Sequence, residues 1–222
     1  MENKRVVVFD LDDTLYKEID FLKSAFKEIS KVISINNSHD VEDIFNDMMR
    51  YHEEKLNSFE LVLKKYPCHL SIKDLLIIYR NHIPEISVSK NVMNVLESLK
   101  ENKIKIGVIT DGRSIQQRNK LKALGIEDFF SEIIISEEFG SEKPNLKNFE
   151  YFENIYGKAS YFYVGDNVKK DFIAPNKLNW ITICLVDNGL NIHSQKTTLI
   201  NQEKYLATYS VNELTQILSI IF

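Results

Sequence analysis

Hydrophobic residues along the chain gather in five short runs that are rich in Val and Ile and are bounded by turn residues. Runs of this kind are typical of strands that are buried on both faces of a parallel sheet. The five predicted strands span residues 5–10, 104–110, 132–136, 161–166 and 182–186. Amphipathic stretches with helical spacing lie between them. The pattern therefore predicts an α/β fold, a Rossmann-like parallel sheet with helices on both faces.

The interval between the first two predicted strands is too long for a single connection. A strand–helix–strand unit needs about 30 residues, whereas the first strand ends at residue 10 and the second begins at residue 104. Helical patterns fill this interval at residues 19–33, 41–50, 59–65 and 74–80, and Pro67 and Pro84 interrupt them. We therefore expect a small all-helical cap domain, residues 17–87, inserted into a core that is formed by residues 1–16 and 88–222.

The end of the chain carries one more helical pattern. Ser210 and Glu213 have the spacing of a capping box, which marks a helix N-terminus. The apolar residues that follow at helical spacing are Leu214, Ile217, Leu218 and Ile221. We expect a last helix that begins after Ser210 and packs on the core. The polar segment 188–204 has no readable period, and the sequence predicts no function for it.

Composition and charge narrow the classes of partner. The 222 residues are 44% hydrophobic and 27% charged, and 28 Lys and Arg against 32 Asp and Glu give a net charge of -4. This balance offers no basic surface for a nucleic acid polymer. Cys68 and Cys184 lie far apart without zinc-site spacing, and the first 16 residues hold too short an apolar run for a signal peptide. We expect a cytoplasmic monomer or homodimer without a membrane partner.

Polar residues follow the first two predicted strands at their carboxyl ends, where open α/β sheets bind ligands. Asp10 and Asp12 leave the first strand two positions apart, so their side chains face the same side of an extended segment. The second strand leads into Thr110, Asp111 and Gly112, which offer a hydroxyl and backbone amides. Donors of this kind suit phosphate oxygens. The sequence therefore predicts a site for a phosphorylated ligand at this edge.

Charged residues follow the third and fourth predicted strands. Lys143 stands beside Pro144 after the third strand, and Asp166 and Asp171 follow the fourth with four residues between them. Carboxylate oxygens are the ligands that Mg²⁺ prefers. Because converging carboxylates repel one another without a cation, we expect Mg²⁺ and Lys143 to share the site with them.

The four motifs, taken in this order, resemble those of the haloacid dehalogenase superfamily of phosphohydrolases. Those motifs are Asp-x-Asp-x-Thr, a Ser or Thr, a Lys, and Gly-Asp-x4-Asp, and the resemblance covers residues 5 to 186. A helical cap inserted after the first motif is similar to that of phosphoglycolate phosphatases and nucleotidases. The resemblance implies a Mg²⁺-dependent phosphatase that hydrolyses a small phosphorylated metabolite, such as a sugar phosphate or a nucleoside monophosphate, through an aspartyl-phosphate intermediate.

The resemblance also implies a role for each motif residue. Asp10 would be the nucleophile, and Asp12 would act as general acid and then as general base. The group that binds the phosphoryl oxygens would consist of Thr110, Asp111, Gly112 and Lys143. The metal ligands would be Asp10, the backbone carbonyl of Asp12, and Asp166. Asp171 and Thr14 would support the site from outside the metal coordination.

Other interpretations of the same residues remain open. A phosphomutase would share every core residue, a 2-haloacid dehalogenase would attack carbon without a metal, and a non-catalytic binding protein would keep only the fold. We expect Asp13, which faces away from the catalytic pair, to have a structural role. For Arg113 and Arg118 a contact with substrate is the alternative to a salt-bridged or solvated helix surface, which we expect.

Overall fold

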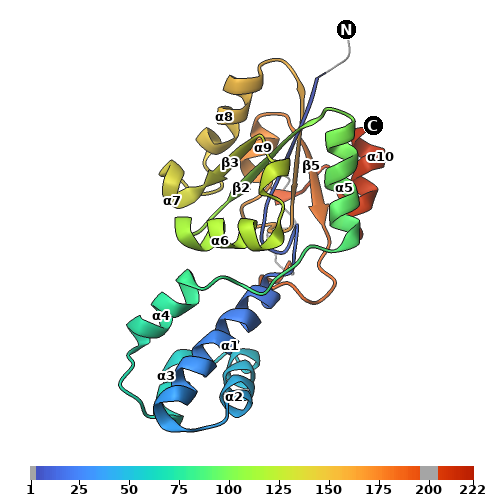
Figure 1. Cartoon of the computed structure of the whole chain (residues 1–222). Helices are drawn as coiled ribbons and strands as arrows, with labels where there is room; N and C mark the ends of the chain where they lie inside the picture. Colours follow the sequence, from blue (N-terminus) through green and yellow to red (C-terminus); the bar gives the residue numbers. More distant parts are fainter. Residues whose placement is uncertain (1–3, 196–204) are drawn as a thin grey trace.

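The computed structural model describes residues 4–195 and 205–222. Its described residues form a six-stranded parallel sheet in the order β3-β2-β1-β4-β5-β6 (Figure 1). The strands are β1 (Arg5–Phe9), β2 (Lys105–Thr110), β3 (Glu132–Ile135), β4 (Ser160–Gly165), β5 (Ile181–Leu185) and β6 (Tyr209–Val211). The first five lie within one residue of their predicted bounds, and the predicted fold class is confirmed.

Helices cover both faces of the sheet because alternate strand residues point to opposite sides. In β1, Val7 and Phe9 belong to one buried cluster, while Val6 and Val8 belong to another. The first cluster packs against α5 (Lys90–Glu101), α6 (Ser114–Leu124) and the short α10 (Leu218–Ile221). The second packs against α8 (Leu146–Tyr156) and α9 (Ile173–Lys177). Between β3 and α8 lies one further turn of helix, α7 (Ser136–Phe139).

The insertion after β1 is helical, as predicted, and forms a separate body below the sheet in Figure 1. It contains α1 (Glu18–Asn37), α2 (Val41–Glu53), α3 (Ser58–Lys65) and α4 (Ile72–Asn81). Ser71 and Asp74 form a capping box at the start of α4. The helices enclose a third hydrophobic cluster, with Ile29, Ile44 and Leu75 at its centre. The cap domain is thus present, while its limits at residues 17 and 87 stay a prediction.

The C-terminal segment differs from the expectation. Ser210 does not cap a helix, because it lies in β6, where it pairs with Cys184 of β5. The backbone groups of this segment are therefore engaged by the sheet edge. A capping box does occur, but it begins three residues later, at Glu213 with Gln216, and opens a 3₁₀ turn (Leu214–Ile217) that continues into α10.

The strand order determines where a ligand would bind. From β1 the chain proceeds to β2 and β3 on one side, and β4 then pairs with β1 on the other side. The carboxyl ends of β1 and β4 therefore flank the topological switch point of the sheet, where ligands bind in open α/β folds. Asp10 leaves β1 at this point, and its amide donates to the Val164 carbonyl of β4 at 2.8 Å.

Close packing of α8 on β2 predicts a stability effect at Gly107. A Cβ at this position would collide with the ring of Phe152. Gly107→Ala should therefore lower the free energy of unfolding by about 1–3 kcal/mol, as overpacking of a core does. Urea denaturation measures the change. Combining Gly107→Ala with Phe152→Leu should restore part of the lost stability. Strictly additive losses of stability in the double variant would contradict the predicted collision.

Candidate active site

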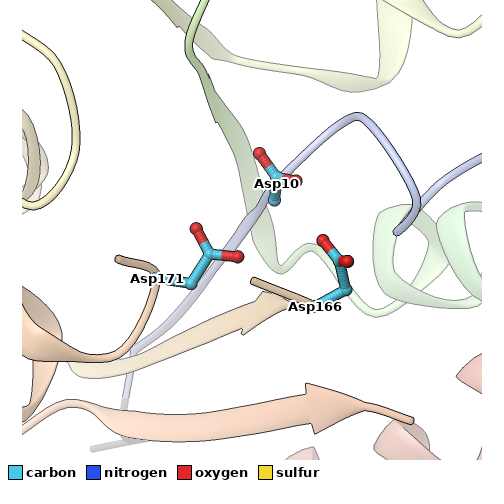
Figure 2. Close-up of side chains that lie close together, drawn as sticks. All are labelled: Asp10, Asp166 and Asp171. Atoms are coloured by element: carbon cyan, nitrogen blue, oxygen red, sulfur yellow. The ribbon is translucent and has the colours of Figure 1, made fainter. Parts of the chain in front are cut away.

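Three aspartates from two strand ends converge at the switch point (Figure 2). Asp10 follows β1, and Asp166 and Asp171 follow β4; all three are buried. One carboxylate oxygen of each lies within 4.8 Å of the others. Such a set of hard oxygen ligands fits a divalent cation of the Mg²⁺ type.

The acidity of these groups supports the same fit. Burial raises the pKa of Asp10 to about 7, and the nearby charges of Asp171 and Asp12 act in the same direction. Burial likewise raises the pKa of Asp166 to about 9, with further contributions from Asp10 and Asp171. Lys143 acts in the opposite direction on both groups, but its positive charge does not offset their burial and mutual repulsion. A bound divalent cation would supply the additional positive charge.

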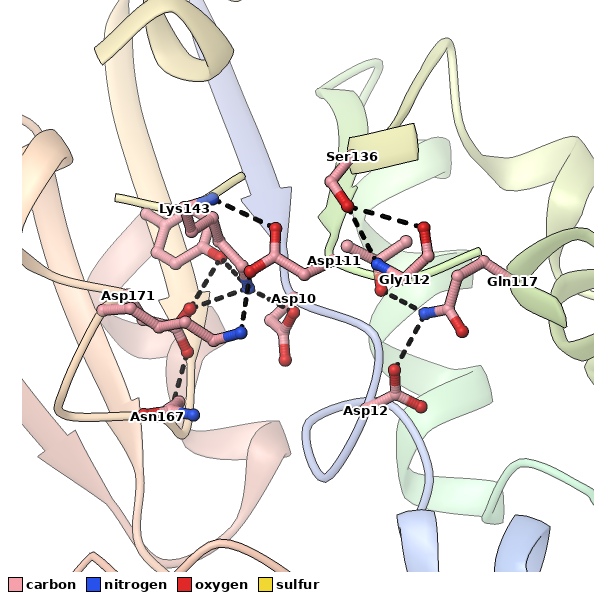
Figure 3. Close-up of polar contacts among 12 residues, drawn as sticks. Asp10, Asp12, Asp111, Gly112, Gln117, Ser136, Lys143, Asn167 and Asp171 are labelled. Atoms are coloured by element: carbon pink, nitrogen blue, oxygen red, sulfur yellow. Dashed lines mark hydrogen bonds and ion pairs between the residues drawn. The ribbon is translucent and has the colours of Figure 1, made fainter. Parts of the chain in front are cut away.

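Lys143 is the cation that the protein itself places in the cluster (Figure 3). Its Nζ lies 2.5 Å from Asp10 Oδ1 and 2.7 Å from Asp171 Oδ1, and its side chain is 1% exposed. Burial alone would lower the pKa of Lys143, but the two aspartates outweigh it and raise the pKa well above its ordinary value. Lys143 therefore stays charged. Nζ also donates to the Tyr163 hydroxyl at 3.1 Å, a contact that the sequence analysis did not predict.

Asp12 is not part of the three-aspartate cluster, and both of its carboxylate oxygens accept hydrogen bonds. Oδ1 accepts from the Tyr16 hydroxyl at 2.5 Å and from Lys120 Nζ at 2.6 Å. Oδ2 accepts from Gln117 Nε2 at 2.8 Å (Figure 3), and the same amide lies 2.5 Å from Thr110 Oγ1. Burial would raise the pKa of Asp12, but these donors, Lys120 first, outweigh it and lower the pKa.

The loop after β2 is braced by its neighbours. The Asp111 carboxylate accepts from the Lys143 amide at 3.0 Å and from Lys170 Nζ at 2.7 Å. The Gly112 amide donates to Ser136 Oγ at 2.9 Å, and its φ of 148° favours glycine. Asp111 is thus engaged in holding the loop, and a contact of this loop with substrate stays a prediction.

The segment after β5, for which the sequence predicted no function, also contacts the site. Asn191 Nδ2 donates to Asp166 Oδ2 at 2.8 Å, and Asn191 Oδ1 accepts from Lys17 at 2.6 Å. Asp13 accepts from the backbone amides of Glu18 and Ile192, which agrees with its expected structural role. Residues 196–204 of this polar segment lie outside the described residues.

Three further expectations concern the surroundings. The Thr14 hydroxyl is buried and has no hydrogen-bond partner within residues 4–195 and 205–222, so its supporting role stays a prediction. Arg113 pairs with Glu137 and Arg118 pairs with Glu138 on the protein surface, as expected. None of the helices that the structure describes is long and apolar enough to span a bilayer.

Two hollows are lined by residues of both the core and the cap. A pocket of about 80 Å³ lies at Asp10, Asp12 and Asp166, with Glu18 of α1 at its edge. A cleft of about 990 Å³ separates the cap from the core. Its cap side includes Leu22, Phe26, Phe59, Leu76, Tyr79 and Arg80, and its core side includes Gly112, Arg113, Ser136 and Glu142.

Comparison with known proteins agrees with this geometry. The chain matches the haloacid dehalogenase-like hydrolase family over residues 7–185. It is 30% identical to the glyceraldehyde 3-phosphate phosphatase of Methanocaldococcus jannaschii over 97% of this chain and 96% of that protein. It is 26% identical to the pyrimidine 5'-nucleotidase YjjG of Escherichia coli over 95% of each. The HAD-hydrolase YfnB of Bacillus subtilis, whose crystal structure has magnesium bound, shares the fold with a TM-score of 0.63 at 20% identity over 99% of both chains. The chain belongs to the haloacid dehalogenase-like hydrolase family.

Proposed function

We propose that this protein is a Mg²⁺-dependent phosphatase that hydrolyses a small phosphate monoester with Asp10 as the nucleophile. The observation that carries the proposal is the position of Lys143, which joins Asp10 to Asp171 inside the buried cluster that also contains Asp166. The ammonium reduces the repulsion between Asp10 and an incoming phosphate dianion. It thereby allows a carboxylate to approach phosphorus.

In the first step, an Asp10 oxygen attacks phosphorus and the bond from phosphorus to the leaving oxygen breaks. Protonated Asp12 gives its proton to that oxygen, so that an alcohol departs and Asp12 becomes a carboxylate. The donors around Asp12 favour its charged form before substrate binds. The dianionic phosphate shifts this balance, because a nearby negative charge raises the pKa of a carboxyl group.

In the second step, Asp12 acts as the base. It takes a proton from a water molecule whose oxygen attacks phosphorus, and the bond from phosphorus to Asp10 breaks. Inorganic phosphate departs, Asp10 returns as a carboxylate, and Asp12 is protonated again. Splitting hydrolysis into two displacements replaces one difficult step with two easier ones.

The cation site would be formed by Asp10, Asp166 and the backbone carbonyl of Asp12. Mg²⁺ held there would neutralise charge on the phosphate and in the transition state. Asp171 would keep Lys143 in place, since its Oδ1 accepts from Nζ at 2.7 Å. Thr110 would donate its hydroxyl to a phosphoryl oxygen. Dehalogenation at carbon would leave Asp12 and Asp166 without a role, so the same residues favour a phosphate ester.

We further propose that the substrate is a nucleoside monophosphate. Five relatives are named for glyceraldehyde 3-phosphate, and one is named for pyrimidine nucleotides. The cleft of about 990 Å³ lies at the upper end of the usual range for small-molecule sites. Phe59 and Tyr79 line it, with their ring centres 5.9 Å apart and their planes at 67°, so the rings contact each other edge to face. Aromatic side chains of this kind suit a planar base better than a triose.

Replacing the nucleophile tests the reaction. Asp10→Asn should lower the release of inorganic phosphate by at least about 10³-fold, because the amide cannot form the phosphoenzyme. A colorimetric phosphate assay over nucleoside monophosphates and sugar phosphates measures the loss. Asp128→Asn, at an exposed site in the 3₁₀ turn that follows α6 (Glu127–Phe129), is the matched control and should keep full activity. Rearranged sugar phosphate without free phosphate would instead indicate a mutase.

The raised pKa values predict how Mg²⁺ stabilises the fold. Because the pKa of Asp166 is raised to about 9, the protonated form stabilises the metal-free fold at low pH, and this contribution is lost as the pH rises toward 9. Mg²⁺ competes with these protons. At about 100 times its Kd, Mg²⁺ should raise the melting temperature by about 5–10 °C at pH 8. The rise should be much smaller at pH 5.

Differential scanning fluorimetry with and without Mg²⁺ makes this measurement. Asp166→Asn should abolish the rise at pH 8, whereas Asp128→Asn should retain it. An equal rise at both pH values would show that Mg²⁺ binds elsewhere.

The proposed substrate class predicts an effect at Phe59. Phe59→Ala should raise the KM for a pyrimidine nucleoside monophosphate about 10-fold, because stacking of a base on an aromatic ring contributes about 1–3 kcal/mol. The KM for glyceraldehyde 3-phosphate should change less than about 2-fold. Phe45→Ala is the control, since Phe45 packs on the same cap cluster without lining the cleft. Equal changes for both substrates would exclude stacking on Phe59.

A further inference from the structure

Lys120 is a buried lysine of helix α6 that no step of the proposed reaction uses. Its side chain is 1% exposed, and Nζ lies 2.6 Å from Asp12 Oδ1. Removing an ammonium from water is strongly unfavourable unless a carboxylate compensates for the lost hydration. The carboxylate that compensates here is the proposed acid and base of the reaction.

Lys120 acts on Asp12 together with Gln117, one turn earlier in α6. Residues three positions apart lie on the same helix face. Gln117 Nε2 donates to Asp12 Oδ2 at 2.8 Å, while Lys120 donates to Oδ1. Because the two oxygens are held by one rigid helix, the plane of the carboxyl group is fixed relative to the sheet.

The same face of α6 meets the cap. Lys120 Nζ lies 3.9 Å from Glu18 Oε1 and 4.4 Å from the centre of the Phe21 ring, both in the first turn of α1. Asn119 Nδ2 donates at 3.1 Å to the carbonyls of Asn81 and His82, where α4 ends. Helix α6 therefore contacts the cap where the chain enters it and where the chain leaves it.

We propose that Lys120 is a positioning residue for Asp12, with the first turn of the cap as its second support. This inference rests on the proposed role of Asp12. Lys120 holds the carboxyl group in one orientation, so that its proton reaches the leaving oxygen when the bond to phosphorus breaks. A misplacement of about 1 Å in such a group can lower a rate about 10²-fold.

Two aryl phosphates of similar shape separate this role from a purely structural one. The leaving group of p-nitrophenyl phosphate departs readily as an anion, whereas that of phenyl phosphate needs the proton from Asp12. Lys120→Met should lower kcat/KM for phenyl phosphate by about 10- to 100-fold. For p-nitrophenyl phosphate the fall should be less than about 5-fold. Lys120→Arg should recover most of the phenyl phosphate activity, since a guanidinium also donates to a carboxylate.

Lys122→Met, at an exposed position of the same helix, is the control and should match the wild type on both esters. Beryllofluoride, which stands in for the phosphoryl group on Asp10, should still bind to Lys120→Met in the presence of Mg²⁺. If Lys120→Met does not fold, Lys120→Gln replaces it with the same expected selectivity.

An equal fall in kcat/KM for the two esters, or no fall, would overturn the positioning role while leaving the phosphatase intact. A wild-type protein that hydrolyses neither ester nor any phosphorylated metabolite would overturn the proposed function together with this inference.

Discussion

Carboxylates that are buried close together repel one another, and each loses the hydration that stabilises its charged form. The carboxyl ends of β1 and β4 bring Asp10, Asp166 and Asp171 into this situation. Parallel pairing of the two strands brings Asp10 and Asp166 to the same edge of the sheet, and the turn after β4 adds Asp171. Positive charge is needed to stabilise these three carboxylates in their charged form. Lys143 supplies part of it, and the carboxylate oxygens can hold a divalent cation that supplies the remainder.

Much of this arrangement could be predicted from sequence because it depends on strand ends. Buried parallel strands are recognisable as apolar runs, and their carboxyl ends meet at one edge whatever lies between them in the chain. The structure accordingly brings Asp10, Lys143 and Asp166 together although they are far apart in sequence. The helical cap was predictable for a similar reason, since its long amphipathic patterns do not fit a sheet.

The contacts around Asp12 could not be predicted in the same way. Gln117 and Lys120 lie in a helix whose polar residues resemble those of any exposed face, and their burial depends on contacts with residues far away in the sequence, such as Asp12. Asn191 lies in a segment without periodicity, and its contact with Asp166 depends on the path of the loop after β5. At Ser210 the local pattern itself was misleading: its capping-box spacing predicts the start of a helix, but the residue pairs with the edge of the sheet instead. In each case a long-range contact, which local pattern does not encode, decides the outcome.

Asp10 and Asp12, the two carboxylates of the proposed reaction, are therefore supported in different ways. Asp10 extends from the central strand and is fixed by the core alone, through the β4 backbone and Lys143. Asp12 lies in the loop that leads into the cap and depends on α6, which also contacts the cap at Glu18. The position of Asp10 is thus independent of the cap, whereas that of Asp12 is not. A substrate that holds the cap against α6 would position Asp12 without disturbing Asp10. Proton transfer by Asp12, as proposed, would then be linked to occupation of the cleft.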